Sequence, residues 1–326
     1  MTFSWQVLQQ SFKVAGEFRI SRGARTQVSV LQLKISYGDY KGIAECVPYA
    51  RYGESLASSA EEINKALSQF NDLPTRQQIL ESVKAGAARN AIDCALWDLE
   101  AKISGKRVWE LISTASPKPL VSAYTISADT PKKMQEKASS LRGIPLLKLK
   151  LLGEDDLERI EAVHNTRPSA SIIIDANEAW DADTYDFIVP KLEKLGVVVI
   201  EQPLPASSEH TLNTKSNIEI CADESITDIS SLETLPAHYT MVNIKLDKAG
   251  GLTAALEMIK YARCKGLKVM VGCMLGSSLA MAPAFVAAQQ ADFVDLDGPL
   301  LLSEDREFGF VFSGSTMQIP SSALWG

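Results

Sequence analysis

Two rhythms of apolar and polar residues divide the chain at about residue 117. In the first part, residues 27–35 alternate apolar and polar side chains as a half-exposed strand does, and residues 87–105 carry apolar side chains at helical spacing up to a glycine. Strands followed by helices predict a small α+β domain over residues 1–117. We expect the C-terminal segment 303–326 to join this domain.

From residue 118 the chain alternates short apolar runs with helical segments. The eight runs that we expect to be strands are 120–126, 145–150, 171–176, 196–203, 218–224, 239–246, 267–273 and 292–297. This alternation predicts an α/β fold, a (β/α)8 barrel of the TIM type over 118–302, with its active site at the C-terminal ends of the strands. A doubly wound sheet is the alternative, but it requires a glycine-rich first turn, and the sequence contains no GxGxxG.

An acidic residue ends each of three successive predicted strands. These residues are Asp175, Glu201 and Asp223, each about one βα unit from the next. The C-terminal ends of neighbouring barrel strands lie side by side, and three adjacent carboxylates repel one another unless a cation lies between them. Oxygen ligands favour Mg²⁺. The alternative, that three unrelated acids cap the helices that follow, explains one acid more easily than three in succession.

Lysines end the predicted strands on either side of these acids. Lys148 and Lys150 alternate with leucines at the end of the second strand and therefore point to the same face, and Lys245 ends the sixth strand. The second and sixth strands lie on opposite sides of an eight-stranded ring. Two amines can then face each other across a carboxylate substrate, one removing an α-proton and the other returning it, while the metal stabilises the ene-diolate. Ordinary surface positions are the alternative for each lysine.

Composition limits the partners of the chain. Lys and Arg total 33 against 40 Asp and Glu, and this net charge of −7 argues against nucleic acid or a membrane surface as a partner. Residues 269–291 carry no charge, but glycine, serine, proline and glutamine interrupt them, which favours a buried strand and helix over a membrane span. The five cysteines are widely spaced without a CxxC pair, which favours reduced thiols over disulfides and a cytoplasmic protein. A homo-oligomer remains open.

Five motifs resemble the enolase superfamily, in its muconate-lactonizing subgroup, and together they extend over essentially the whole chain. They are KLK at 148–150, DAN at 175–177, EQP at 201–203, ADES at 222–225 and NIKLDKAGG at 243–251. The resemblance implies a modified (β/α)7β barrel with an α+β capping domain. It also implies that the three strand-end acids bind Mg²⁺, that Lys150 and Lys245 form the acid/base pair, and that Lys148 lies next to the substrate carboxylate.

Within this superfamily the chain most resembles the L-Ala-D/L-Glu dipeptide epimerases. Asp295 and Asp297 end the eighth strand in a DxD motif similar to the one that holds the free ammonium of a dipeptide in that group. Residues 22–25 and 48–55 resemble its specificity loops. Arg25 is our candidate for binding the glutamyl side-chain carboxylate, because a guanidinium matches a carboxylate with two hydrogen bonds; a solvated loop arginine is the alternative.

Two further candidates and one departure complete the predicted pocket. Thr125 and Cys273, near the ends of the first and seventh strands, complete the substrate-binding set. After the seventh strand, Gly276 stands where many relatives carry an acid, which leaves the side-chain preference of the pocket open.

The sequence therefore predicts a Mg²⁺-dependent isomerase that epimerises a small-molecule dipeptide of the L-Ala-D/L-Glu type by 1,1-proton transfer. In a bacterium, the resemblance implies a role in cell-wall peptide recycling. The alternatives are o-succinylbenzoate synthase, N-acylamino acid racemase and muconate cycloisomerase, whose substrates lack a free ammonium, or a barrel without catalytic activity.

Overall fold

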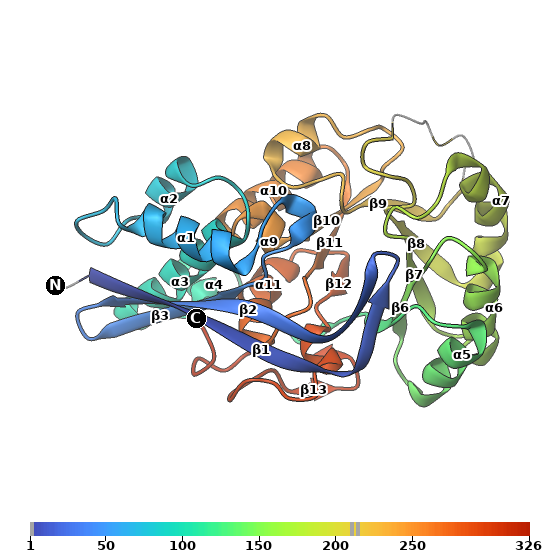
Figure 1. Cartoon of the computed structure of the whole chain (residues 1–326), viewed down its shortest axis with the longest axis horizontal. Helices are drawn as coiled ribbons and strands as arrows, with labels where there is room; N and C mark the ends of the chain where they lie inside the picture. The colour runs from blue at the N-terminus through green and yellow to red at the C-terminus, as the bar shows by residue number, and fades with distance from the viewer. Residues whose placement is uncertain (1–2, 209–211, 213–215) are drawn as a thin grey trace.

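An antiparallel sheet and four helices form the first part of the chain in the computed structural model, which describes residues 3–208, 212 and 216–326. The sheet has the order β1 (Phe3–Ile20), β2 (Gly23–Tyr37) and β3 (Tyr40–Cys46), followed by the 3-10 turn η1 (Ala50–Tyr52). The helices are α1 (Leu56–Leu67), α2 (Arg76–Ser82), α3 (Ala87–Ser104) and α4 (Val108–Leu111). The long β1–β2 hairpin reaches from this cap toward the second part of the molecule (Figure 1).

Helix α3 forms the centre of the cap. Most of its side chains are buried, and it ends at Gly105, which adopts a left-handed conformation with φ 67°. Strand β3 crosses it so closely that a Cβ on Gly42 would lie 2.1 Å from the Ala95 carbonyl oxygen, so only glycine fits there. The helix predicted from apolar spacing is confirmed.

Eight parallel strands form the second part of the chain. Along the sheet they are β5 (Tyr124–Ile126), β6 (Leu146–Lys150), β7 (Ser171–Asp175), β8 (Val197–Glu201), β9 (Glu219–Ala222), β10 (Met241–Lys245), β11 (Lys268–Gly272) and β12 (Phe293–Asp295). The sheet closes on itself, because the Ala123 amide next to β5 donates to the Val294 carbonyl of β12 at 2.8 Å. The predicted barrel is therefore confirmed, and with it the α/β class.

Helices and turns connect and cover the barrel strands. They are α5 (Pro131–Ser140), α6 (Asp156–Thr166), α7 (Ala182–Leu192), η2 (Glu193–Leu195), α8 (Ile229–Glu233), α9 (Leu246–Ala249), α10 (Leu252–Cys264), α11 (Ser278–Ala288) and η3 (Gly298–Leu301). The uncharged stretch 269–291 forms most of β11 and the covered helix α11. Among the described residues, no helix combines the length and the apolar character that a membrane crossing requires. All five cysteines are free thiols.

A small apolar core fills the barrel below its C-terminal end. It consists of Ala123, Ile173, Val199, Cys221, Met241 and Met270. Along a strand, side chains two residues apart share a face, so the residue two positions after a member of this core also points inward. Asp175 follows Ile173, Glu201 follows Val199 and Asp223 follows Cys221 in this way. The apolar layer therefore supports a polar one.

The C-terminal segment contacts both parts of the molecule. Its strands β13 (Phe312–Ser313) and β14 (Thr316–Met317) form a small sheet with β4 (Leu120–Val121). Beyond them, the Trp325 indole donates to the Cys94 carbonyl of α3 at 3.0 Å, and the Gly326 amide donates to Asp98 at 2.8 Å. The division into a capping domain over 1–117 with 303–326 and a barrel over 118–302 stays a prediction.

Helix α9 connects the barrel to the cap directly after Lys245. Asp247 Oδ1 accepts hydrogen bonds from the Val47 amide at 3.0 Å and from the Asn90 side chain at 2.8 Å. The Arg89 guanidinium donates to the carbonyls of Ala249 at 2.7 Å and Gly250 at 3.1 Å. Burial raises the pKa of Asp247 from 3.8 to about 7, although the hydrogen bonds from Val47 and Asn90 lower it.

The Asp247→Asn substitution should flatten the dependence of stability on pH. The pKa of Asp247 is higher in the folded state than in the unfolded state, so the folded state binds more protons between pH 4 and 7, and stability falls as pH rises through that window. Asparagine keeps the acceptor for Val47 without the buried charge. Between pH 5 and pH 8, the free energy of unfolding measured in urea should fall by on the order of 1 to 3 kcal/mol more for the wild type than for the variant. Equal losses would contradict this reading of Asp247.

Candidate active site

Charged side chains of the barrel meet in the polar layer at the C-terminal ends of β6 to β12. Strand register aligns Lys150 of β6 with Asp175 of β7, and Asp175 with Glu201 of β8. Lys150 Nζ lies 2.5 Å from Asp175 Oδ2. Lys148, fully buried, lies 2.6 Å from Glu201 Oε2, 2.7 Å from Asp295 Oδ2 and 3.2 Å from Asp175 Oδ2. Leu147 and Leu149, which alternate with these lysines, are buried in the main core, as alternation predicts.

The opposite wall holds the second predicted lysine. Lys245 Nζ of β10 lies 2.6 Å from Asp223 Oδ2. Two neighbours that sequence reasoning missed complete this wall: Lys248 donates to Asp223 Oδ1 at 2.5 Å and to the Asp223 carbonyl at 2.6 Å, and Asn243 donates to Glu201 Oε1 at 2.8 Å. Both lie within the motif 243–251, where Asn243 alternates with Lys245 and Lys248 follows three residues later.

Burial and the neighbouring lysines set the charges of the three acids. Burial alone raises the pKa of Asp175, but Lys150 and Lys148 lower it to about 2. Burial also opposes ionisation of Asp223, yet Lys245 and Lys248 hold its pKa well below the usual range. Burial and the Asp175 carboxylate raise the pKa of Glu201 to about 7. The negative charge of Glu201 is therefore compensated least by neighbouring lysines among the three acids.

This donor set fits a divalent cation. All three side chains offer oxygen ligands from successive strand ends, and Glu201 Oε2 accepts no well-aligned hydrogen bond although Lys148 is near. The described residues include no cluster of three acidic, histidine or cysteine side chains around one point. Asp175 instead pairs with Lys150, and Asp223 pairs with Lys245. A cation between the acids would relieve the repulsion that raises the pKa of Glu201.

The two aspartates of the DxD motif are buried at the C-terminal end of β12. Strand β12 ends at Asp295, two residues earlier than predicted, because η3 begins directly after Asp297. Asp297 Oδ2 accepts the Thr125 amide at 2.5 Å. Burial and the nearby Asp295 raise the pKa of Asp297 to about 7. Asp295 Oδ1 is buried and has no hydrogen-bond partner among the described residues.

A cavity lies above the lysines, between the barrel and the cap. The cap side of its lining consists of Phe18, Ile20, Arg22 and Arg25 of the β1–β2 hairpin and of Tyr49 and Tyr52 after β3. The barrel side includes Lys150, Asp223, Lys245, Cys273, Met274 and Leu275. Arg25 is exposed, and its guanidinium lies over the Tyr49 ring, 5.3 Å from the centroid. Cys273 is half-buried, and burial together with Asp295 raises the pKa of its thiol well above the usual value.

The glycine at position 276 has a structural reason. A Cβ on Gly276 would lie 2.9 Å from Glu45 Oε1 and 3.1 Å from the Val47 side chain. Glu45, a buried residue of β3, accepts the Ser277 amide at 2.8 Å and pairs with Arg306 at 2.5 Å. A carboxylate supplied by the cap therefore lies beside Gly276.

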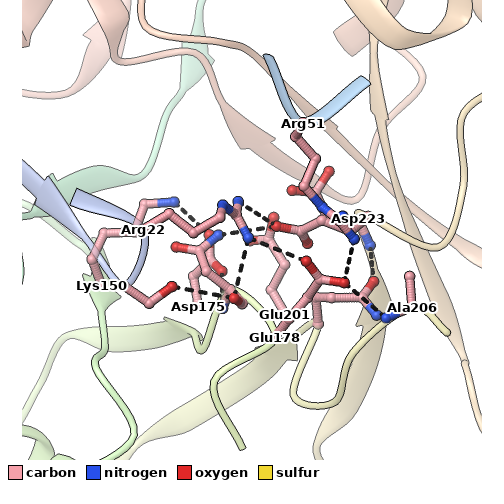
Figure 2. Close-up of polar contacts among 12 residues, drawn as sticks. Arg22, Arg51, Lys150, Asp175, Glu178, Glu201, Ala206 and Asp223 are labelled. Atoms are coloured by element: carbon pink, nitrogen blue, oxygen red, sulfur yellow. Dashed lines mark hydrogen bonds and ion pairs between the residues drawn. The ribbon is translucent and has the colours of Figure 1, made fainter. Parts of the chain in front are cut away.

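Four charged residues missing from the sequence predictions join the cap to the barrel beside the cavity, and two of them, Arg22 and Glu224, line it. Arg22 and Arg51 of the cap both pair with Glu178, which follows β7 (Figure 2). Arg22 also pairs with Glu224, which follows β9. Arg22 lies within the RGAR motif at 22–25, Glu224 within the ADES motif at 222–225, and Arg51 within the predicted specificity loop at 48–55. No local pattern indicates these pairings, because the partners come from loops far apart in the chain.

Two protein-family models match the chain. Residues 3–113 match the mandelate racemase / muconate lactonizing enzyme N-terminal domain, and residues 133–321 match a domain described as enolase C-terminal domain-like. Together they cover the cap and most of the barrel.

Named relatives extend over nearly the whole chain. An N-acetyl-D-glutamate racemase from a Pseudoalteromonas species is 46% identical over 292 residues, which are 88% of this chain and 92% of the relative. The L-Ala-D/L-Glu epimerase of Escherichia coli K12 is 40% identical over 317 residues, or 96% and 99%. A solved enolase family member from Agrobacterium tumefaciens, with homology to dipeptide epimerases and with sodium and L-Ala-L-Glu bound, is 47% identical, covers 100% of both chains and has a TM-score of 0.97.

These relatives are racemases and epimerases, which are isomerases, and the predicted superfamily is confirmed. Mg²⁺ is the cofactor of this family, as the sequence analysis predicts. The chain belongs to the mandelate racemase / muconate lactonizing enzyme family of the enolase superfamily.

Proposed function

We propose that this protein epimerises dipeptides of the L-Ala-D/L-Glu type at the glutamyl α-carbon, by 1,1-proton transfer between Lys150 and Lys245 through an ene-diolate. The observation that carries the proposal is the placement of these two lysines, which line one cavity from β6 and from β10, with the three acids on the strands between them. The epimerase of Escherichia coli and the solved relative with L-Ala-L-Glu bound support the choice of substrate.

Each lysine acts on one face of the α-carbon. One amine takes the proton in its neutral form, and the ammonium on the opposite wall returns a proton and inverts the centre. The carboxylates around Lys245 raise its pKa well above the usual value despite burial, so while paired with Asp223 it is an ammonium able to donate. Asp175, Glu201 and Asp223 would hold Mg²⁺, which supplies positive charge that makes the α-proton of a carboxylate substrate more acidic. Lys148 adds a buried positive charge beside them.

The ends of the dipeptide have separate candidate partners. Asp295 and Asp297 would hold the free ammonium, because a cation suits two buried carboxylates of which one oxygen lacks a hydrogen bond. Arg25 would bind the glutamyl side-chain carboxylate. No acid pairs with it in the described part of the chain, and Tyr49 supports its guanidinium. Thr125 fixes Asp297 through its backbone amide, and Cys273 lines the cavity.

Hydrogen exchange at carbon tests the proposal directly. Purified protein with Mg²⁺ in D₂O should place deuterium at the glutamyl α-position of L-Ala-L-Glu and accumulate the L-Ala-D-Glu epimer, both followed by NMR. If the protein binds Mg²⁺ but exchanges no α-proton of this dipeptide, the assigned substrate is wrong.

Racemisation of an N-acylated glutamate is the second candidate. The relative that is 46% identical is an N-acetyl-D-glutamate racemase, and its substrate lacks an ammonium. Asp297 suits either substrate, since its pKa of about 7 allows an ionised carboxylate that binds an ammonium or a neutral one that donates to an acyl oxygen.

The Asp297→Asn variant should separate the two substrates. On a dipeptide the variant loses a carboxylate that faces the ammonium, so kcat/KM should fall on the order of 100-fold. On N-acetylglutamate it retains a hydrogen-bond donor and should lose on the order of tenfold or less. Steady-state assays of both substrates give the ratio. A variant that keeps full dipeptide activity would favour the N-acyl substrate.

A further inference from the structure

Arg22 lies at the tip of the β1–β2 hairpin and contacts two loops of the barrel. Its Nη2 donates to Glu224 Oε1 at 2.7 Å, and its Nη1 donates to the Asn177 carbonyl at 3.2 Å and to Glu178 Oε2 at 3.3 Å. The neighbouring Ser21 hydroxyl donates to the same Asn177 carbonyl at 3.2 Å. The hairpin tip is therefore attached to the loop that begins directly after Asp175 of β7 and to the loop after β9, which contains Asp223.

Glu178 attaches a second segment of the cap to the same place. Its Oε1 lies 2.5 Å from Arg51 Nη2 of η1 and accepts the Ala206 amide at 2.8 Å (Figure 2). Asn177 and Glu178 both have positive φ, at 46° and 68°, an uncommon backbone conformation for residues other than glycine. Residues in such conformations persist where surrounding contacts hold them. We name Arg22, Arg51, Glu178 and Glu224 the arginine clamp.

The acidic side of the arginine clamp is shielded from water. The Glu224 side chain is 2% exposed and that of Glu178 is 13% exposed, against 30% for Arg22. Ion pairs with a buried partner are screened less by solvent than surface pairs, and guanidinium–carboxylate hydrogen bonds are among the stronger ones in proteins. The clamp can therefore hold the hairpin in place, unlike an ordinary surface ion pair.

Arg25 lies on the same hairpin but has no part in the clamp. It is paired across the hairpin with Phe18, and both residues line the cavity. Arg22 lines the cavity too, but its guanidinium is already bound to carboxylates and a carbonyl. The two arginines, three positions apart, thus differ in availability: Arg22 is occupied by the protein and Arg25 can bind an incoming carboxylate.

We propose that Arg22 is a positioning residue for substrate selection, which anchors the hairpin through the arginine clamp so that Arg25 lies over the reaction centre. This inference rests on the proposed function, in which Arg25 binds the glutamyl carboxylate. Lys150 and Lys245 lie on barrel strands outside the hairpin, so loss of the anchor should weaken recognition of the acidic side chain more than proton transfer itself.

A substrate comparison tests the role of Arg22. The variants are Arg22→Gln, Arg22→Lys and the matched control Arg19→Gln; Arg19 lies on the same hairpin but pairs only with the exposed Glu17 among the described side chains. For Arg22→Gln, the ratio of kcat/KM for L-Ala-L-Glu to that for L-Ala-L-Gln should fall about tenfold, mainly through KM. Arg22→Lys should recover part of the ratio, because lysine keeps the positive charge but lacks the planar guanidinium that donates to several acceptors at once. Arg19→Gln should keep the wild-type ratio.

Amide hydrogen exchange of the Mg²⁺-loaded protein gives a second readout, independent of any substrate. Peptides covering 16–26 and 47–53 should exchange faster in Arg22→Gln than in the wild type or in Arg19→Gln. Equal exchange in all three proteins, or equal loss of activity toward both dipeptides, would overturn the role of Arg22. If the wild type exchanged no α-proton of L-Ala-L-Glu, the proposed function would be contradicted instead. The amide exchange rates would still decide whether the arginine clamp anchors the hairpin.

Discussion

Replacing Lys150 with alanine should abolish epimerisation and leave α-proton exchange on only one epimer of the dipeptide. The two lysines lie on opposite walls of the cavity, so each reaches one face of the α-carbon. In the variant, Lys245 can still remove a proton from its own face and return it there. Lys245→Ala should show the reverse preference. Each variant should lose epimerisation by on the order of 10³-fold.

Proton NMR in D₂O, started separately from L-Ala-L-Glu and L-Ala-D-Glu, measures both rates. Lys268→Ala is a matched control, because Lys268 begins a barrel strand at the opposite end and pairs with the partly exposed Glu219. This control should behave as the wild type does. If both lysine variants lost exchange on the same epimer, the assignment of one lysine to each face would be wrong.

Replacing Glu201 with glutamine should remove the response of the protein to Mg²⁺. Burial and the neighbouring Asp175 raise the pKa of Glu201 to about 7, so this carboxylate gains the most when a cation compensates its charge. Glutamine keeps the shape and an acceptor for Asn243 without the charge. Mg²⁺ affinity should fall on the order of 100-fold and epimerisation on the order of 10³-fold. The metal-free variant should be at least as stable as the metal-free wild type.

Thermal unfolding with and without Mg²⁺, together with titration calorimetry, measures these effects. Mg²⁺ binding to the folded state alone raises the unfolding temperature of the wild type, and this rise should vanish in the variant. Glu45→Gln is the control: it also alters a buried carboxylate, but one that pairs with Arg306 away from the metal site. It should lower stability and keep the Mg²⁺ response. A normal response in Glu201→Gln would exclude Glu201 as a ligand.

The barrel was predictable because its strands carry a simple signal. Short apolar runs with a polar residue at the end place Asp175, Glu201 and Asp223 on one rim, whatever the details of packing. The same period placed Lys148 and Lys150 on one face. These placements depend on alternation within a strand and on the order of strands, both of which are local properties of the sequence.

The mouth of the cavity could not be predicted in the same way. Arg22 meets Glu224 across 202 positions in the chain, and no local pattern specifies which loop a hairpin tip will reach. Asp297 was expected to continue an extended strand, but the turn into η3 changes its backbone and lets it accept the Thr125 amide. The roles of the individual site residues stay predictions until the variants are measured.

The hairpin that crosses from the cap to the barrel separates two tasks in the chain. Arg25, the candidate for binding the substrate side chain, and Arg22 lie before residue 53, and the candidate acid/base and metal residues lie after residue 147. Mutations in the hairpin can therefore change which acid or peptide is accepted while the proton-transfer machinery stays intact. Such a division favours divergence of substrates within one family, and it makes residues 16–26 the first segment to exchange when redesigning this protein for a new substrate.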